Sequence, residues 1–388
     1  MRPLRCLATI PALLALFFGS AGRTETPGLP PTGVSHEEIA RSTAGATLEN
    51  LRGDLLAVFY PATVPTVPHY ETRYPALYDR TAFLYVPRPR RSDVLDRLVT
   101  VHYRSTDTET AFRITRLVAR LIYLHRLRFR RPVSFPRSAD SADIWVNAPP
   151  GRGNAMGGET RTNQIYLFAV PERKPIEWVR TLCHEWGHLT LVAARGFVSP
   201  EPDAAGYLGE RLFFKWLRED RDGAADDFTT HTDQDLYHRR QVAPLIEQFL
   251  AEGPGSPRLK QTDVAGMDYY IGAALALDET FGSSILAKAL WSVDSENARA
   301  LVDAVRNVLR SSATFSVRTP AWVPLDTGTF DITGSPAGLL GVADRPPLAV
   351  SERPRPLTVR LAGWKRARNL RQGTMTVTFS RRRSEETP

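Results

Sequence analysis

The sequence predicts an α+β protein, because segments typical of strands and of helices occupy separate stretches of the chain. The first part mixes both kinds of segment, residues 175–309 are almost continuously helical in pattern, and the chain beyond residue 312 consists of short β-type runs separated by Pro and Gly. This order predicts a mixed sheet with helices, then an α-helical subdomain, then a small β-rich C-terminal region.

The first part contains two expected helices. Residues 35–51 fit a helix that begins with Ser35 as N-cap and has Glu38 three positions later, a capping box. Residues 107–130 fit a buried helix, because their apolar residues recur three or four positions apart. Strands are expected at 82–86, 99–103, 142–146 and 164–169, and a glycine-rich loop at 149–163.

The remaining elements follow from the same two periodicities. Helices are expected at 175–194, 205–219, 233–251, 263–281 and 283–293, followed by a segment that ends near residue 309. Strands are expected at 314–317, 329–332, 357–361 and 374–379.

The N-terminus has the layout of a secretory signal peptide over residues 1–22. Two arginines precede an apolar stretch at 6–18, and small residues follow at 19–22. The apolar stretch of about 13 residues is shorter than the about 20 that a membrane-spanning helix needs. We therefore expect cleavage after Ala21 or Gly22, a secreted or periplasmic protein, and no stable transmembrane anchor. Residues 23–34, rich in Pro, Gly and Thr, are expected to form a linker.

Composition excludes some classes of protein. The chain has 388 residues, 42% of them hydrophobic and 24% charged, which is ordinary for a folded protein. Its two cysteines exclude a disulfide-stapled scaffold and a zinc finger built on thiolates. Cys6 belongs to the expected signal peptide, and Cys183 is expected to be a small buried residue.

The strongest chemical signal is the segment His184-Glu185-Trp186-Gly187-His188 within the expected helix 175–194. Histidines at positions i and i+4 share one helix face, so both imidazoles can reach one tetrahedral zinc ion. Glu185 lies beside that face, where it can take a proton from water and return it to a leaving amine. The apolar residues around the histidines indicate a buried helix, and a bound metal would explain two buried histidines one turn apart.

A third ligand must come from another segment, and the favoured residue is Glu210. It lies 22 residues after His188 in the next expected helix, among apolar neighbours that would direct its carboxylate inward. Burying an unpaired carboxylate is costly, and coordination of a metal would remove that cost. Glu201 and Asp203 are alternatives, but they belong to a loop flanked by Pro.

Together, these residues resemble the gluzincins, zinc peptidases of the thermolysin and monozinc-aminopeptidase kind. Residues 207–210, Tyr-Leu-Gly-Glu, are similar to that family's W-L-N-E-G segment, with Gly209 in place of Asn. The resemblance implies a zincin-like catalytic domain over residues 35–312, followed by a β-rich basic region at 313–388. It also implies His184, His188 and Glu210 as metal ligands and Glu185 as catalytic base.

Two weaker similarities lie on either side of the zinc motif. Residues 269–275 resemble a helix of the aminopeptidases in which a tyrosine hydroxyl donates to the oxyanion. Tyr269 holds that position, with Tyr270 as the alternative donor and a core aromatic as the alternative interpretation. Residues 153–157 are similar to the G-A-M-E-N edge strand, but Gly157 replaces the glutamate that binds a free amine. An edge strand that holds an extended peptide is therefore expected, and an aminopeptidase is not indicated.

The predicted function is a secreted metallopeptidase that hydrolyses peptide bonds of a peptide or protein substrate through a metal-activated water, with one Zn²⁺ per chain. The alternative is an exported binding or adhesion protein on a catalytically retired zinc-peptidase scaffold. Nucleic acid is not an expected partner, because the sequence lacks the aromatic–basic platform of the usual modules.

The net charge of +8 is concentrated at the C-terminus. Residues 352–388 contain ten Lys and Arg against three Glu, so the rest of the expected mature chain is close to neutral. A basic end on an exported protein predicts contact with an anionic envelope polymer.

Overall fold

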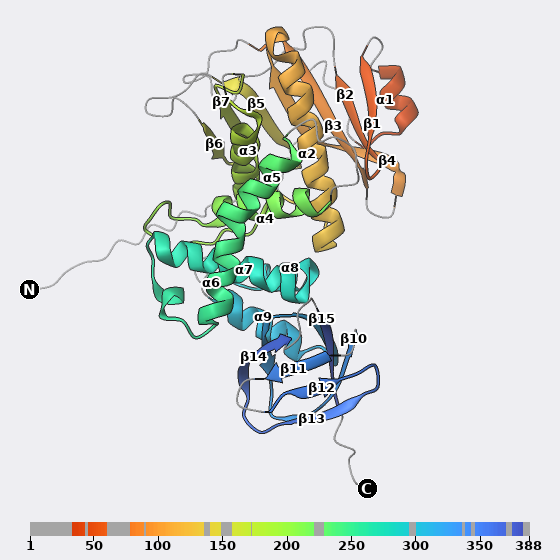
Figure 1. Cartoon of the computed structure of the whole chain (residues 1–388). Coiled ribbons are helices and arrows are strands. Elements are labelled where there is room, and N and C mark those ends of the chain that lie inside the picture. Colours follow the sequence, from red (N-terminus) through yellow and green to blue (C-terminus); the bar gives the residue numbers. More distant parts are fainter. Residues whose placement is uncertain are drawn as a thin grey trace, which may run out of the picture.

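The computed structural model describes residues 33–42, 46–59, 78–88, 91–135, 140–148, 157–171, 173–220, 229–294, 300–335, 338–342, 346–369 and 375–382. The expected signal peptide and nearly all of the expected linker lie outside these residues. A mixed sheet lies at one end of the molecule, helices occupy the middle, and antiparallel strands lie at the other end (Figure 1). The predicted α+β class is confirmed.

The N-terminal sheet has seven strands in the order β1-β2-β3-β4-β5-β7-β6. Strand β4 pairs in parallel with β5, and β5 with β7, whereas the other neighbours are antiparallel. The sheet is therefore mixed, as predicted, and β6 is its last strand among the described residues. The strands are β1 (Thr47–Leu51), β2 (Leu55–Phe59), β3 (Arg80–Arg88), β4 (Arg91–Tyr103), β5 (Ala142–Ala148), β6 (Gly157–Arg161) and β7 (Gln164–Phe168).

Both faces of this sheet are buried. In β2, Leu55, Ala57 and Phe59 belong to the main hydrophobic core, whereas Leu56 and Val58 belong to a second cluster on the opposite face, as the two-residue period of a strand requires. The main core contains residues of α2 and α3, and the second cluster contains Ile39 of α1. These helices are α1 (His36–Ser42), α2 (Thr108–Phe129) and α3 (Pro175–Thr190).

The middle of the molecule is helical, as predicted. The predicted helix over 233–251 consists of two α-helices joined by a π-helical turn, His238–Val242. Gly282 separates the next two helices, and its φ of +87° is a conformation that glycine adopts without strain. The helices are α4 (Ala205–Glu219), α5 (His231–Tyr237), α6 (Ala243–Glu252), α7 (Val264–Phe281), α8 (Ser283–Leu290) and α9 (Leu301–Arg310).

The C-terminal strands form two four-stranded antiparallel sheets, in the orders β13-β10-β15-β8 and β12-β11-β14-β9. Residues of both sheets share one hydrophobic cluster, so the two sheets pack face to face. Trp322 in β9 donates to the carbonyl of Leu250 in α6 at 3.1 Å and joins this unit to the helices. The strands are β8 (Thr314–Thr319), β9 (Ala321–Leu325), β10 (Gly328–Ser335), β11 (Gly338–Val342), β12 (Leu348–Val350), β13 (Arg355–Val359), β14 (Gly363–Asn369) and β15 (Met375–Arg381).

The basic C-terminal stretch is an integral part of these sheets, since it supplies β13, β14 and β15. Part of its charge is paired within the unit: Arg381 contacts Asp326 at 2.6 Å and Arg382 contacts Asp331 at 2.7 Å. Contact with an anionic envelope polymer stays a prediction.

One sequence-based prediction at the N-terminus is wrong. The helix expected at 35–51 ends at Ser42, and residues 47–51 form β1, which pairs with β2 along its whole length. The capping box is confirmed: the backbone N–H of Ser35 donates to Glu38, and that of Glu38 donates to the Ser35 hydroxyl. Among the described residues, no helix is both long and apolar enough to cross a membrane.

His125 in α2 is fully buried, and neither ring nitrogen has a hydrogen-bond partner in the described structure. Burial and, to a smaller extent, the charge of Arg131 lower the pKa of His125 to about 3. Below pH 6.5, His125 is therefore protonated in the unfolded chain but neutral in the native state. The free energy of unfolding then falls by up to about 1.4 kcal/mol for each pH unit.

Replacing His125 by Leu should remove this loss. At pH 5 the gain in unfolding free energy should exceed the gain at pH 7.5 by about 2 kcal/mol. Urea denaturation of both proteins at the two pH values measures the difference. An equal change at both pH values would contradict a neutral His125 in the native state.

Candidate metal centre

Helix α3 carries the two histidines and is firmly anchored. Pro175 begins the helix, and the Glu177 carboxylate accepts the backbone N–H of Lys174 at 3.3 Å. The inward face of the helix buries apolar residues in the main core, Cys183 among them. The predicted burial of Cys183 is confirmed, and a rigid helix therefore presents the two imidazoles.

The structure brings His184, His188 and Glu201 together as a group that could hold a metal ion. The Nε2 atoms of the two histidines lie 3.2 Å apart. One carboxylate oxygen of Glu201 lies 3.5 Å from Nε2 of His184 and 3.4 Å from Nε2 of His188. Two imidazole nitrogens at this separation repel each other through their lone pairs unless a proton or a cation lies between them, so this corner favours a positive ion.

Two further features fit a bound cation. The second carboxylate oxygen of Glu201 is buried and has no hydrogen-bond partner in the described structure, so it is available as a ligand. Gly206 in the first turn of α4 leaves the space beside the imidazoles open, because a Cβ there would lie 2.3 Å from Nε2 of His188 and 2.6 Å from Nε2 of His184.

The loop between α3 and α4 is held by Asp203. One of its carboxylate oxygens accepts the backbone N–H of Ala194 at 2.8 Å and that of Ala205 at 2.9 Å, so it ties the two ends of the loop together. Val198 also donates its backbone N–H to the carbonyl of Thr262 at 2.7 Å. These bonds fix the backbone on both sides of Glu201. Asp203, one of the alternatives to Glu210, therefore stabilises the conformation of the loop.

Glu210 occupies a different position from the predicted one. Its Oε2 faces Nδ1 of His184 at 3.7 Å, on the opposite side of the imidazole from Glu201. Its Oε1 accepts from Arg180 at 2.8 Å and from the hydroxyl of Tyr237 at 2.7 Å. Glu201 therefore faces both Nε2 atoms, whereas the carboxylate of Glu210 is held by Arg180 and Tyr237, and Glu210 as a metal ligand stays a prediction.

The histidines and carboxylates at this site stabilise each other's charged forms. Burial alone would lower the pKa of His184, but the carboxylates of Glu201 and Glu210 raise it to about 9. Against the effect of burial, the histidines hold the pKa of Glu201 at about 2. Contacts with His184 and neighbouring arginines hold that of Glu210 at about 2. Both carboxylates are therefore ionised, and a cation between Glu201 and the imidazoles would replace the proton on His184.

Glu185 lies beside the group and is 7% exposed. Burial raises the pKa of its carboxyl group, although both histidines oppose the shift. The hydroxyl of Thr160 in β6 donates to its Oε2 at 2.7 Å, which fixes the carboxylate between α3 and the last strand of the sheet. A carboxylate with a raised pKa next to a metal position can accept a proton from water and release it again.

Tyr269, the predicted oxyanion donor, is not brought to this group. Its hydroxyl donates to the carbonyl of Gly253 at 2.6 Å, and its side chain is buried against Phe249. The alternative interpretation, a core aromatic, describes Tyr269 better, and Tyr270 is likewise 2% exposed in the core. Tyr207 lies at the site instead, with its ring 4.8 Å from that of His184. The sequence could have indicated this, because Tyr207 lies three residues before Glu210 and so shares its helix face.

Two glycines explain how α3 and α4 approach so closely. A Cβ on Gly187 would lie 2.8 Å from Cα of Gly209, and a Cβ on Gly209 would lie 2.4 Å from Cα of Gly187. The helices therefore touch backbone to backbone one residue before His188. This contact requires glycine at both positions.

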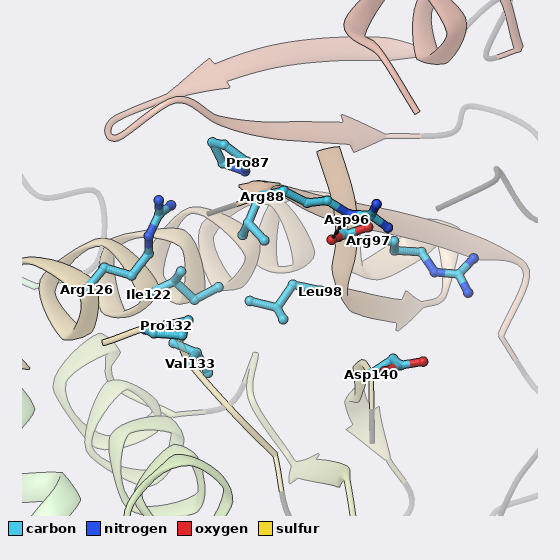
Figure 2. A pocket seen from close by; sticks show the side chains of 11 residues that line it. Pro87, Arg88, Asp96, Arg97, Leu98, Ile122, Arg126, Pro132, Val133 and Asp140 are labelled. Carbon is cyan, nitrogen blue, oxygen red and sulfur yellow. Dashed lines mark hydrogen bonds and ion pairs between the residues drawn. The ribbon is translucent and has the colours of Figure 1, made fainter. Parts of the chain in front are cut away.

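A cleft of 380 Å³ opens beside His184. Strand β6, helix α3 and helix α4 supply its walls, and Glu185, Tyr207 and Glu210 all line it. A separate cavity of 260 Å³ lies between β3, β4 and the end of α2 (Figure 2). Its described lining has arginines and aspartates over apolar residues such as Leu98 and Ile122, but no histidine or cysteine. The cleft is therefore the better candidate for an active site.

Replacing Gly206 by Ala should prevent metal binding, because the added methyl group would lie 2.3 and 2.6 Å from the two Nε2 atoms and would displace both imidazoles. The alanine is a good helix former, so the fold should persist. Metal content after dialysis and the thermal unfolding temperature together test this expectation. A Gly206→Ala protein that keeps a full complement of metal would show that the ion binds elsewhere.

Neither the protein-family models nor the curated proteins include a match to the chain. Among solved structures, the chain is similar to the aminopeptidase A of Legionella pneumophila, in complex with aspartic acid, with 11% identity and a TM-score of 0.32. The match covers 87% of this chain and 42% of that chain, so this protein spans less than half of that enzyme's length. A similarity at this level indicates nothing about activity, which must be inferred from the site itself.

Proposed function

We propose that the protein is a secreted, zinc-dependent peptidase with His184, His188 and Glu201 as metal ligands. The observation that carries the proposal is the spacing of their three donor atoms, which lie between 3.2 and 3.5 Å apart. Zinc–ligand bonds of about 2.0–2.2 Å place the donors of a tetrahedral site about 3.3–3.5 Å apart. Three protein ligands would leave the fourth position open, as catalytic zinc sites do.

In this proposal, the metal ion, Glu185 and Tyr207 have different roles in hydrolysis. A bound zinc ion supplies a Lewis acid that polarises a carbonyl group and makes water a better nucleophile. Glu185 would accept the proton of the attacking water and deliver it to the leaving amine. Tyr207, whose hydroxyl has no hydrogen bond in the described structure, is the candidate to donate to the developing oxyanion.

Strand β6 supports a peptide as the substrate. It is the last described strand of the sheet, and its Gly157 and Gly158 line the cleft beside Glu185. A peptide in extended conformation could add to this edge through backbone hydrogen bonds and lie across the metal position. Gly158 lets β6 lie close to α3 and to Glu185, because a Cβ there would lie 2.8 Å from Cγ of Glu185.

The proposal is tested by metal content and cleavage. The protein purified from zinc-supplemented medium should contain about one zinc per chain and should cleave members of a peptide library, and a chelator should abolish cleavage until zinc is restored. Protein that purifies without zinc would contradict the metal assignment. Zinc without cleavage of any peptide would favour the alternative, a binding protein on a retired peptidase scaffold.

A further inference from the structure

Arg180 lies one helical turn before His184 in α3, so the two side chains share a helix face. Its guanidinium lines the cleft and lies over the ring of Tyr237, 5.3 Å from the ring centroid. The side chain is 43% exposed, whereas its partner Glu210 is 6% exposed. A permanently charged group therefore lines the cleft one helical turn from His184, a candidate metal ligand.

The guanidinium is only partly used by the protein. Its Nε donates to Glu210 at 2.8 Å and the guanidinium also hydrogen-bonds the side chain of Tyr237, but no carboxylate or carbonyl among the described residues accepts from its terminal amino groups. These two groups form the end of the fork with which arginine binds a carboxylate in a bidentate manner. The terminal amino groups of Arg180 can therefore still bind a carboxylate of a ligand.

Arg173, the other arginine that lines the cleft, differs in this respect. Its terminal amino groups donate to the carbonyls of Gly157 and Glu177 and to the hydroxyl of Thr181. It joins β6 to α3 and has a structural role. The acidic groups of the cleft are also engaged, since Glu177 caps its helix, Glu185 accepts from Thr160 and Glu210 accepts from Tyr237.

We propose that Arg180 binds a carboxylate of the substrate and makes the enzyme selective for peptides that present one near the scissile bond. This inference rests on the proposed peptidase function and adds the substrate class. The carboxylate can belong to the C-terminus of a short peptide or to an Asp or Glu side chain, and both would make the same bidentate contact.

Matched peptide pairs distinguish these sources. One pair compares a free C-terminal carboxylate with a C-terminal amide, and a second set compares Glu with Gln at each position flanking the cleaved bond. The wild-type enzyme should prefer the carboxylate member of at least one pair by about 10- to 100-fold in kcat/KM, the usual range for a charge-assisted contact. Equal kcat/KM within every pair would overturn the inference while leaving the peptidase intact.

Variants of Arg180 distinguish binding of a substrate carboxylate from structural support of Glu210. Arg180→Gln should remove the preference, and Arg180→Lys should restore part of it because the charge remains. Arg211→Gln is the matched control, because Arg211 also contacts Glu210, at 3.5 Å, but does not line the cleft, so the preference should persist. If Arg180 only supported Glu210, Arg180→Gln would lower kcat/KM equally for both members of each pair.

Binding provides a readout independent of turnover. Calorimetric titration of the zinc-loaded protein with the product peptides, as free acids and as amides, should show the same preference in Kd. Failure of all cleavage together with a retained preference in binding would contradict the peptidase proposal alone. The Glu and Gln product peptides are titrated in the same way, and equal Kd values within every acid–amide and Glu–Gln pair would contradict the role of Arg180.

Discussion

Replacing Glu185 by Gln should reduce peptide hydrolysis by about 10²- to 10⁴-fold, the usual contribution of a positioned general base. Glutamine has nearly the same shape and can still accept the hydrogen bond from Thr160, but it cannot take up a proton. Because Glu185 is not a member of the donor group formed by His184, His188 and Glu201, the variant should retain its metal. The loss should therefore fall on kcat, with metal content and thermal stability close to those of the parent protein.

Two further variants make this result specific. Glu247→Gln applies the same change at an exposed position of α6 and should leave kcat/KM unchanged. Thr160→Val removes the hydroxyl that holds Glu185 at 2.7 Å and should give a smaller loss, because the carboxylate remains but is less well positioned. Full activity of Glu185→Gln in a protein that contains one zinc would exclude Glu185 as the base.

The sequence was sufficient where the signal is local. His184 and His188 fall on one face of α3 because the helix period alone places them there, and Glu185 follows as their neighbour. The long elements were predictable for the same reason: α4 begins and ends at the predicted residues, and α2 differs by one residue at each end. A periodic pattern of 15 to 22 residues contains enough information to identify a helix.

The sequence failed where the outcome depends on tertiary contacts. Strand β6 lies in the segment expected to be a glycine-rich loop, because only its pairing with β7 makes Gly157–Arg161 extended. Tyr269 had the spacing of a catalytic residue, but the carbonyl of Gly253 takes its hydroxyl. The choice between Glu201 and Glu210 as third ligand also depends on tertiary contacts and is still to be tested. It depends on a loop whose course is fixed by Asp203 and by the distant Thr262, and neither contact has a signature in the sequence.

The two carboxylates therefore deserve a direct comparison through Glu201→Gln and Glu210→Gln. Glu201 offers one oxygen to both Nε2 atoms and a second, unpartnered oxygen, so its replacement should remove a ligand and leave the purified protein without metal. Glu210 faces Nδ1 of His184 and would orient the imidazole and raise its basicity. Loss of such a supporting carboxylate typically costs about 10- to 100-fold in metal affinity.

Competition with a chelator of known affinity measures both variants on one scale. We expect Glu201→Gln to lose metal affinity by more than the 10- to 100-fold range of a supporting residue, whereas Glu210→Gln should fall within about that range. Glu210→Gln should also lower the unfolding temperature, because Arg180 and Tyr237 lose a charged acceptor that is 6% exposed. Glu201→Gln removes the carboxylate that pairs with His184 at 3.5 Å and should also lower the unfolding temperature of the metal-free protein, so metal affinity is the measurement that separates the two variants. The reverse order of metal affinities would restore Glu210 as the third ligand and would mean that binding of the ion turns His184 away from Glu201.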